Sequence, residues 1–192
     1  DLEGKRLGVN TRKDVISLFA HAWAKKTGGD PELINYFEVP FPQMVDAVRE
    51  GRVDAAFVVE PFLSAGVASG AVQVVAWPYS TVLSRIPIMQ FAAHKSYIEA
   101  NKDVITRFVR AYDRGADWMT ENRGNDEWAA LISSYTHIPA DSLRKAGSPL
   151  YPKTVDPAQI ESVVALMKEY QLVKGDIDVH ELLYDTVLGA PQ

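Results

Sequence analysis

The residues best suited to hold a small solute follow the ends of short apolar runs. Polar and charged groups follow "KRLGV" and "VDAAFVV", an aromatic ring follows "NYFEVP", and a tryptophan ends "VQVVAW". The candidate ligand-binding residues are Asn10, Thr11, Arg12, Phe41, Glu60, Pro61 and Trp77. An arginine pairs with anions, and a carboxylate accepts hydrogen bonds from amines, ring N–H groups and hydroxyls. The pattern therefore predicts recognition of a small polar or charged molecule.

The first candidate group lies where a strand feeds directly into a helix. The first N–H groups of a helix have no partner within it, and the helix dipole adds about half a positive charge there. Arg12 or Lys13 could reinforce an anion site at this point. The structural alternative is a helix start capped by Thr11 and Asp14, with exposed basic residues beside it. The pattern leaves both interpretations open.

The other candidates have structural alternatives as well. Two prolines fix the direction of Phe41, which is either an apolar wall for a ligand or a hydrophobic staple on the next helix. Glu60 either points into a crevice as an acceptor or caps the helix that Pro61 begins, with Phe62 as a core residue. Trp77 lies at a strand end and has the best chance of the four tryptophans to touch a ligand.

Catalytic and metal-binding patterns are poor in this chain. No pair of histidines has the helical spacing of metal ligands, and there is no cysteine. The nucleophile elbow G-x-S-x-G and the glycine-rich phosphate loops are absent from the sequence. We therefore expect no catalytic residue, no metal and no cofactor. The histidines are His21, His94, His137 and His180.

Composition is that of an ordinary globular protein. The 192 residues are 47% hydrophobic and 23% charged, and the net charge is −5 with acids and bases interspersed. This balance disfavours a broad nucleic-acid surface. The apolar stretches are strand-sized, too short to cross a bilayer as helices. The chain does not open with a signal-peptide pattern.

The elements that must position the candidates alternate along the first half. Strands are predicted at 5–10, 32–39, 53–59 and 72–77, and helices at 11–29, from Pro42 to Gly51 and from Pro61. Alternating strands and helices indicate an α/β fold with a mostly parallel sheet and right-handed crossovers. In such a sheet, ligands bind beyond the carboxyl ends of the strands, which is where the candidates lie.

The second half changes character. A loop over 78–87 leads to one more predicted strand at 88–94, and only helices follow from Ser96. Amphipathic helices are expected after caps at Asn101, Asp156 and Asp178, and another at 127–135. We therefore divide the chain into residues 1–86, an α/β lobe, and 87–192, a crossover strand with a helical return. These helices need an apolar surface to cover.

Three stretches together resemble a known family. "DLEGKRLGVN", "MVDAVREGRVDAAFVVEPF" and "HKSYIEANKDVITRFVRAYDRGADWM" resemble the periplasmic substrate-binding proteins of ABC importers. The resemblance is to the SsuA/THI5-like branch, for nitrate, sulfonates, taurine and thiamine-pyrimidine precursors. It implies a two-lobed, periplasmic-binding-protein type II fold with a solute held between the lobes. The positions that match the family's second-lobe pocket are Asn10, Thr11, Arg12, Glu60 and Pro61.

The resemblance also carries expectations about partners and extent. It implies a small-molecule ligand, an ABC permease as membrane partner, and a periplasmic or lipoprotein-anchored location. Asp1 aligns with the start of the family's second lobe, so we expect one complete lobe followed by the helical return of the other. Val59 stands where the family often has a tryptophan, so a stacking contact with the ligand is not expected here.

Three alternatives stay open. Relatives of this fold act as enzymes of pyrimidine and menaquinone pathways, and His94 is the histidine placed for such a role. The effector domain of a transcription regulator shares the lobe architecture. The third open point concerns assembly and not function, since the uncovered helices could pair with a second copy of the chain.

Overall fold

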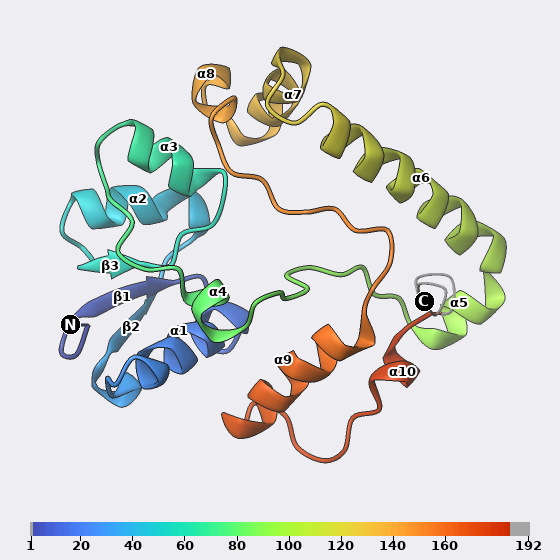
Figure 1. The fold of residues 1–192 in the computed structure, drawn as a ribbon, viewed down its shortest axis with the longest axis horizontal. Helices are drawn as coiled ribbons and strands as arrows, with labels where there is room; N and C mark the ends of the chain where they lie inside the picture. Colours follow the sequence, from blue (N-terminus) through green and yellow to red (C-terminus); the bar gives the residue numbers. More distant parts are fainter. Residues whose placement is uncertain (1, 185–192) are drawn as a thin grey trace.

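The computed structural model of the chain describes residues 2–184. Asp1 and residues 185–192 lie outside the described residues. The predicted parts, 1–86 and 87–192, begin and end in these stretches. Figure 1 shows an α/β part, which comprises the elements from β1 to α4. A long helical part leaves it through α5 and α6 and comes back to it through α7, α8 and α9 (Figure 1).

The sheet is parallel, as the alternation of strands and helices predicts. It contains β1 (Arg6–Val9), β2 (Asn35–Glu38) and β3 (Ala55–Ala56), in the order β2-β1-β3. Leu7 lies opposite Tyr36 on one side and Ala55 on the other, and both ladders are parallel. A one-turn 3-10 helix, η1 (Pro31–Leu33), precedes β2. Because the strands run the same way, their carboxyl ends share one edge.

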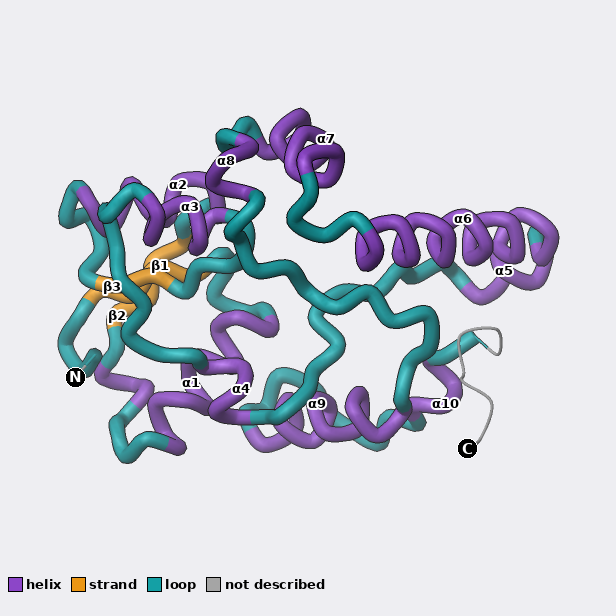
Figure 2. Tube along the Cα trace, turned by 45° about the horizontal axis from the view of Figure 1, so that its top comes forward, coloured by secondary structure: helices purple, strands orange, loops and turns teal. Residues whose placement is uncertain are grey.

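Helices cover both faces of this sheet. Figure 2 shows α2 (Phe41–Arg49) and α3 (Phe62–Ala68) on one side of the strands and α1 (Val15–Lys26) and α4 (Pro78–Val82) on the other. Leu7 and Val9 belong to the cluster on the α1 side, whereas Gly8 faces the α2 side. A Cβ at Gly8 would lie 3.2 Å from the Cβ of Ala56, so glycine lets β1 and β3 approach closely.

Each side of the sheet has its own buried apolar cluster. The cluster on the α1 side comprises Leu7, Val9, Ile16, Leu18, Phe19, Ala20, Ala24, Ile34 and Phe57. The cluster on the α2 side comprises Val39, Met44, Ala47 and Val53. Both clusters follow from the predicted spacing. Apolar residues at helical intervals give α1 and α2 one apolar face each, and successive residues of a strand point to opposite faces of the sheet.

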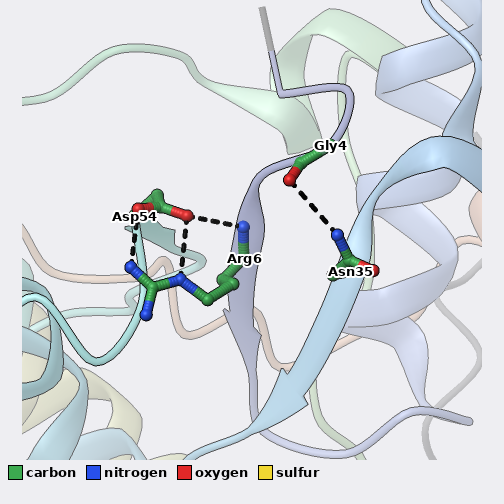
Figure 3. A network of polar contacts seen from close by, with 4 residues as sticks. All are labelled: Gly4, Arg6, Asn35 and Asp54. Carbon is green, nitrogen blue, oxygen red and sulfur yellow. Dashed lines mark hydrogen bonds and ion pairs between the residues drawn. The ribbon is translucent and has the colours of Figure 1, made fainter.

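Polar contacts tie β1 to its neighbours at the amino ends of the strands (Figure 3). Asp54 accepts hydrogen bonds from the backbone N–H and from the guanidinium of Arg6, at 2.8–3.1 Å. These hydrogen bonds from Arg6 hold the pKa of the Asp54 carboxyl well below its usual range. On the other side, the Asn35 amide donates to the carbonyl of Gly4 at 3.2 Å. The contacts align the start of β1 with both neighbouring strands.

Two predicted strands, 72–77 and 88–94, are wrong, because both segments are loops. Their apolar side chains are largely exposed, with Val75 at 75%, Met89 at 89% and Phe91 at 74%. A β-prone segment becomes a strand only where a neighbouring strand pairs with its backbone. Within residues 2–184, the ladders of the sheet join β1 to β2 and to β3 alone.

The predicted loop at 78–87 is also partly wrong, since it contains α4. Pro78 begins this helix, and Tyr79 inserts its ring between Phe19 and Phe57, with ring centroids 4.9 and 5.1 Å away. Edge-to-face contacts of this kind stabilise aromatic clusters. A tertiary contact therefore orders a segment whose composition is typical of a turn.

The hydroxyl of Tyr79 gives an alkaline stability prediction. This hydroxyl is buried without a hydrogen-bond partner among the described residues, and burial raises the pKa of Tyr79 to about 12. Between about pH 10 and pH 12 the unfolded tyrosine loses its proton and the folded one keeps it, so the free energy of unfolding falls by about 2–3 kcal/mol. We expect Tyr79→Phe to remove this part of the alkaline loss, as measured by urea unfolding at pH 8 and pH 11.5.

The control for that measurement is Tyr135→Phe, because Tyr135 is 80% exposed. At neutral pH, Tyr79→Phe is expected to leave stability nearly unchanged, since the lost hydroxyl makes no hydrogen bond within the described residues. Equal alkaline loss in Tyr79→Phe and in the unsubstituted protein would contradict the prediction.

The helical return comprises six helices among residues 95–184. They are α5 (Lys95–Ala100), α6 (Lys102–Glu121), α7 (Asp126–Thr136), α8 (Ala140–Leu143), α9 (Pro157–Glu169) and α10 (Val179–Leu182). The predicted caps at Asp156 and Asp178 are confirmed. Asn101 precedes α6, but its side chain donates to the carbonyl of Tyr97 instead of capping α6. No helix within residues 2–184 combines the length and apolar character needed to cross a membrane.

Within residues 2–184, the return packs against the α/β part at two places. Trp128, Ala129, Ile138 and Leu143 form a buried cluster of α7 and α8, against which Phe62 and Ala65 of α3 pack. Leu166, Met167 and Tyr170, in and just after α9, pack against the cluster on the α1 side. Lys25 of α1 also pairs with Glu169 at 3.1 Å. The apolar surfaces that the return covers are therefore α3 and α1.

Candidate functional site

Six of the seven candidate residues, all but Trp77, follow strands whose carboxyl ends share one edge of the sheet. Asn10, Thr11 and Arg12 follow β1, Phe41 follows β2, and Glu60 with Pro61 follows β3. Both neighbours of β1 run parallel to it, so these loops leave the sheet on the same side. The fold thus places the candidates at the edge where open α/β sheets bind ligands. Their part in binding stays a prediction.

The start of α1 differs from the predicted cap. Asp14, not Thr11, is the N-cap: its carboxylate accepts from the N–H of Ser17, and Ser17 Oγ accepts from the N–H of Asp14. Thr11 lies further upstream, where its hydroxyl oxygen accepts from the N–H of Lys13 at 3.3 Å. Thr11 and Asp14 have the three-residue spacing of a capping box, which led to the prediction. Asp14 and Ser17 have the same spacing, and this second pair forms the box.

Carboxylates already occupy backbone donors at this helix start. Glu38, at the end of β2, accepts from the N–H of Arg12 at 2.9 Å, and Asp14 accepts from Ser17. An anion at these donors would meet two like charges. The positive charge available to an anion is therefore that of the Arg12 and Lys13 side chains, which are both exposed. The Arg12 guanidinium forms no hydrogen bond or ion pair with another described residue.

Phe41 is the first residue of α2 and packs against both apolar clusters. This placement favours the structural interpretation, in which the ring fixes the start of the helix. Trp77 behaves differently, since its side chain is 60% exposed at the start of α4. Its carbonyl oxygen accepts from the N–H of Thr81 at 3.0 Å. An exposed indole at the start of α4 remains available for contact with a ligand.

Among the candidate side chains, that of Glu60 forms the most hydrogen bonds with described residues. Its carboxylate accepts from the N–H of Ser64 at 3.1 Å and from the hydroxyl of Ser64 at 2.9 Å. Ser64 Oγ in turn accepts from the N–H of Gly147, in the segment that follows α8, at 3.2 Å. Glu60 thus caps the first turn of α3, as the structural alternative predicts. The same network reaches the helical return, which sequence reasoning missed.

A cavity of about 410 Å³ opens along the outer edge of β2. Of the predicted site residues, Arg12 lines it; the other lining residues are His21, Ile34, Asn35, Tyr36 and Phe37. His21 stacks on Tyr36 with ring centroids 4.4 Å apart, and its Nδ1–H donates to the carbonyl of Ser17. Burial, reinforced by the charge of Glu32, raises the pKa of Tyr36. Only the tertiary structure brings these rings together.

His94, the histidine of the enzymatic alternative, lies at the N-cap of α5. Its Nδ1 lies 2.8 Å from Ser96 Oγ and accepts from the N–H of Ser96 at 3.4 Å. A capping role accounts for these contacts. Among the residues that the structure describes, no three histidine, aspartate or glutamate side chains gather as a metal site would require.

Comparisons with known proteins agree with this geometry. A family model described as NMT1/THI5 like matches residues 1–125. The fold is similar to that of the periplasmic aliphatic sulphonate binding protein SsuA from Escherichia coli, with a TM-score of 0.69 and 19% identity. The superposition covers 97% of this chain and 64% of that chain, so this chain spans less than two thirds of that protein. None of the curated proteins compared with the sequence matches it.

Proposed function

The chain belongs to the NMT1/THI5-like family, and we propose that it is the solute-binding component of an uptake system. In this proposal a small polar or anionic solute is held at the carboxyl edge of the sheet. The predicted family and the α/β, binding-protein type of fold are both confirmed. We assign residues 1–86 to one ligand-binding lobe and residues 87–192 to the return toward the other.

The observation that carries the proposal is the placement of Glu60. Glu60 is half-buried at the carboxyl edge of the sheet. Its carboxylate accepts hydrogen bonds from Ser64 of α3 and lies next to Gly147, in the segment that follows α8. A solute at this carboxylate would lie between two parts of the chain. Closure of such parts around a ligand is how binding proteins change shape, and the closed shape is what a membrane permease would recognise.

The charges of the candidate site suggest the class of solute. Arg12 offers a cation at the end of β1, and Glu60 offers an acceptor after β3. A solute with an anionic end and a donor end would use both. Taurine has a sulfonate and an ammonium group, so it fits this description better than nitrate does. Aminopyrimidines, which have ring and amino donors, are the second class that Glu60 could hold.

The partners and location follow from the proposed role. No bond is made or broken in the solute, so no cofactor is needed. An ABC permease would receive the solute from the closed protein, which places the protein outside the cytoplasmic membrane, in the periplasm or anchored as a lipoprotein. SsuA, whose fold this chain shares, is itself a periplasmic binding protein.

Calorimetric titration tests the proposal with taurine, ethanesulfonate, nitrate and an aminopyrimidine. We expect micromolar binding of at least one, and preference for taurine over ethanesulfonate, which lacks the ammonium group. Glu60→Gln is expected to weaken taurine binding by about 10–100-fold, since one hydrogen bond to a charged group contributes about 1.5–3 kcal/mol.

The matched control is Glu99→Gln, an exposed acid on α5, which should bind like the unsubstituted protein. Glutamine is chosen at position 60 because it keeps an acceptor for Ser64, whereas alanine would also remove the cap of α3. Unchanged binding of every probe in Glu60→Gln would refute the assignment of Glu60.

A further inference from the structure

The Glu60 carboxylate has acceptor capacity beyond its contacts with Ser64. A carboxylate offers about four lone-pair positions. Ser64 uses two of them, because its N–H donates to Oε2 at 3.1 Å and its hydroxyl to Oε1 at 2.9 Å. A donor group of a solute can therefore bind to Glu60 without displacing Ser64, provided that nothing else fills the space around the carboxylate.

Gly147 of the helical return lies against the Glu60 carboxylate. A Cβ added to Gly147 would lie 2.8 Å from Glu60 Oε1 and 3.3 Å from its Cδ and Cγ. The first distance is shorter than real Cβ contacts, so any larger residue would push the carboxylate aside. The φ angle of Gly147 is not in the positive, left-handed region. A side chain at position 147 would therefore displace the Glu60 carboxylate, whereas the φ angle at this position is one that other residues also adopt.

The backbone of Gly147 also takes part in the network. Its N–H donates to Ser64 Oγ at 3.2 Å, and the same hydroxyl donates to Glu60. Leu143, in the α8 turn just before this segment, is fully buried in the cluster that packs on α3. The packing of α8 on α3 therefore brings Gly147 to the carboxylate.

We propose that Gly147 is a positioning residue of the solute site, through which the helical return sets the orientation of the Glu60 carboxylate. The Gly147 N–H orients the Ser64 hydroxyl toward Glu60, and the missing side chain leaves room for the carboxylate and for a donor group of the solute. The part that concerns the solute rests on the proposed function. The part that concerns the carboxylate does not.

A ligand-free measurement tests the positioning. The amide proton of Ser64, followed by NMR in the 192-residue chain, reports the hydrogen bond to Glu60. We expect Gly147→Ala to move this resonance toward its position in Glu60→Ala, where the bond is lost. The control is Gly115→Ala, because a Cβ at Gly115 meets nothing within 4 Å. An unchanged Ser64 resonance in Gly147→Ala would overturn the proposal.

A binding measurement then connects the positioning to the solute. Gly147→Ala is expected to lower the ratio of taurine to ethanesulfonate affinity by about tenfold, with the ethanesulfonate affinity unchanged. Gly115→Ala should keep the ratio. If Ser64 moves while the ratio holds in both Gly147→Ala and Glu60→Gln, the Glu60 assignment in the proposed function fails and the positioning of the carboxylate stands.

Ser64→Ala is the second variant if Gly147→Ala does not fold. It removes the hydroxyl that Gly147 and Glu60 share and leaves the glycine in place. We expect the amide proton of Gly147 to move upfield as it loses its acceptor. A stationary Gly147 resonance would show that the two segments are not joined through Ser64, and would overturn the proposal.

Discussion

Phe19→Ala is expected to lower the free energy of unfolding by about 3–5 kcal/mol, the range for a buried phenylalanine cut back to alanine. Phe19 is fully buried on α1, at the centre of the cluster that joins α1 to the sheet. Its ring meets that of Tyr79 edge-to-face at 4.9 Å, so the substitution also removes the support of α4. Urea unfolding followed by circular dichroism measures the change.

Phe37→Ala is the matched control for this experiment. Phe37 lies on the edge strand β2 and is 42% exposed, so the same change of side chain removes less buried area. We expect a loss of about 1–2 kcal/mol there. Equal losses at the two positions would show that the cluster on the α1 side is not the main core of the α/β part.

Leu143→Ala is expected to lower the free energy of unfolding by about 3–5 kcal/mol, as for other fully buried leucines. Leu143 ends α8 and is fully buried in the cluster of α7 and α8 that packs on α3. The substitution leaves a cavity where the helical return meets the α/β part. We therefore expect early proteolytic cleavage in the segments on either side of α7 and α8.

Leu150→Ala provides the comparison, since Leu150 follows α8 by a few residues and is 76% exposed. It should leave stability and cleavage unchanged. In Leu143→Ala the amide proton of Ser64 is also expected to move, because the packing of α8 on α3 holds Gly147 beside Ser64. Cleavage at the same rate in both variants would contradict the docking of α8 on α3.

Much of the α/β part could be predicted from local patterns. The stripe of apolar residues on α1 and the alternation of strands and helices lead to the parallel sheet that the structure has. The start of α2 at a proline-fixed turn, the end of that helix before Gly51, and the caps at Asp156 and Asp178 follow from single residues. These features depend on interactions within about one helical turn, or on the spacing of apolar side chains along a helix or strand. Both can be read from the sequence.

The failures share one cause, which is that their outcome depends on a distant partner. Residues 72–77 and 88–94 have β-prone composition, but within the described residues they form no strand. Before α1, the local pattern allows either Thr11 or Asp14 to be the N-cap. In the structure Asp14 caps the helix together with Ser17, and Glu38 of the next strand accepts a hydrogen bond from the N–H of Arg12. Local pattern cannot rank such competitors, because the deciding atoms belong to other elements.

The candidate site shows the same division. The sequence by itself determined that Arg12, Phe41 and Glu60 follow parallel strands, and hence that they lie at one edge of the sheet. The tertiary structure alone decided that Phe41 enters both clusters and that Gly147, 87 residues after Glu60, borders its carboxylate. The order of elements follows from local chemistry, whereas contacts between distant residues arise only when packing brings their surfaces together.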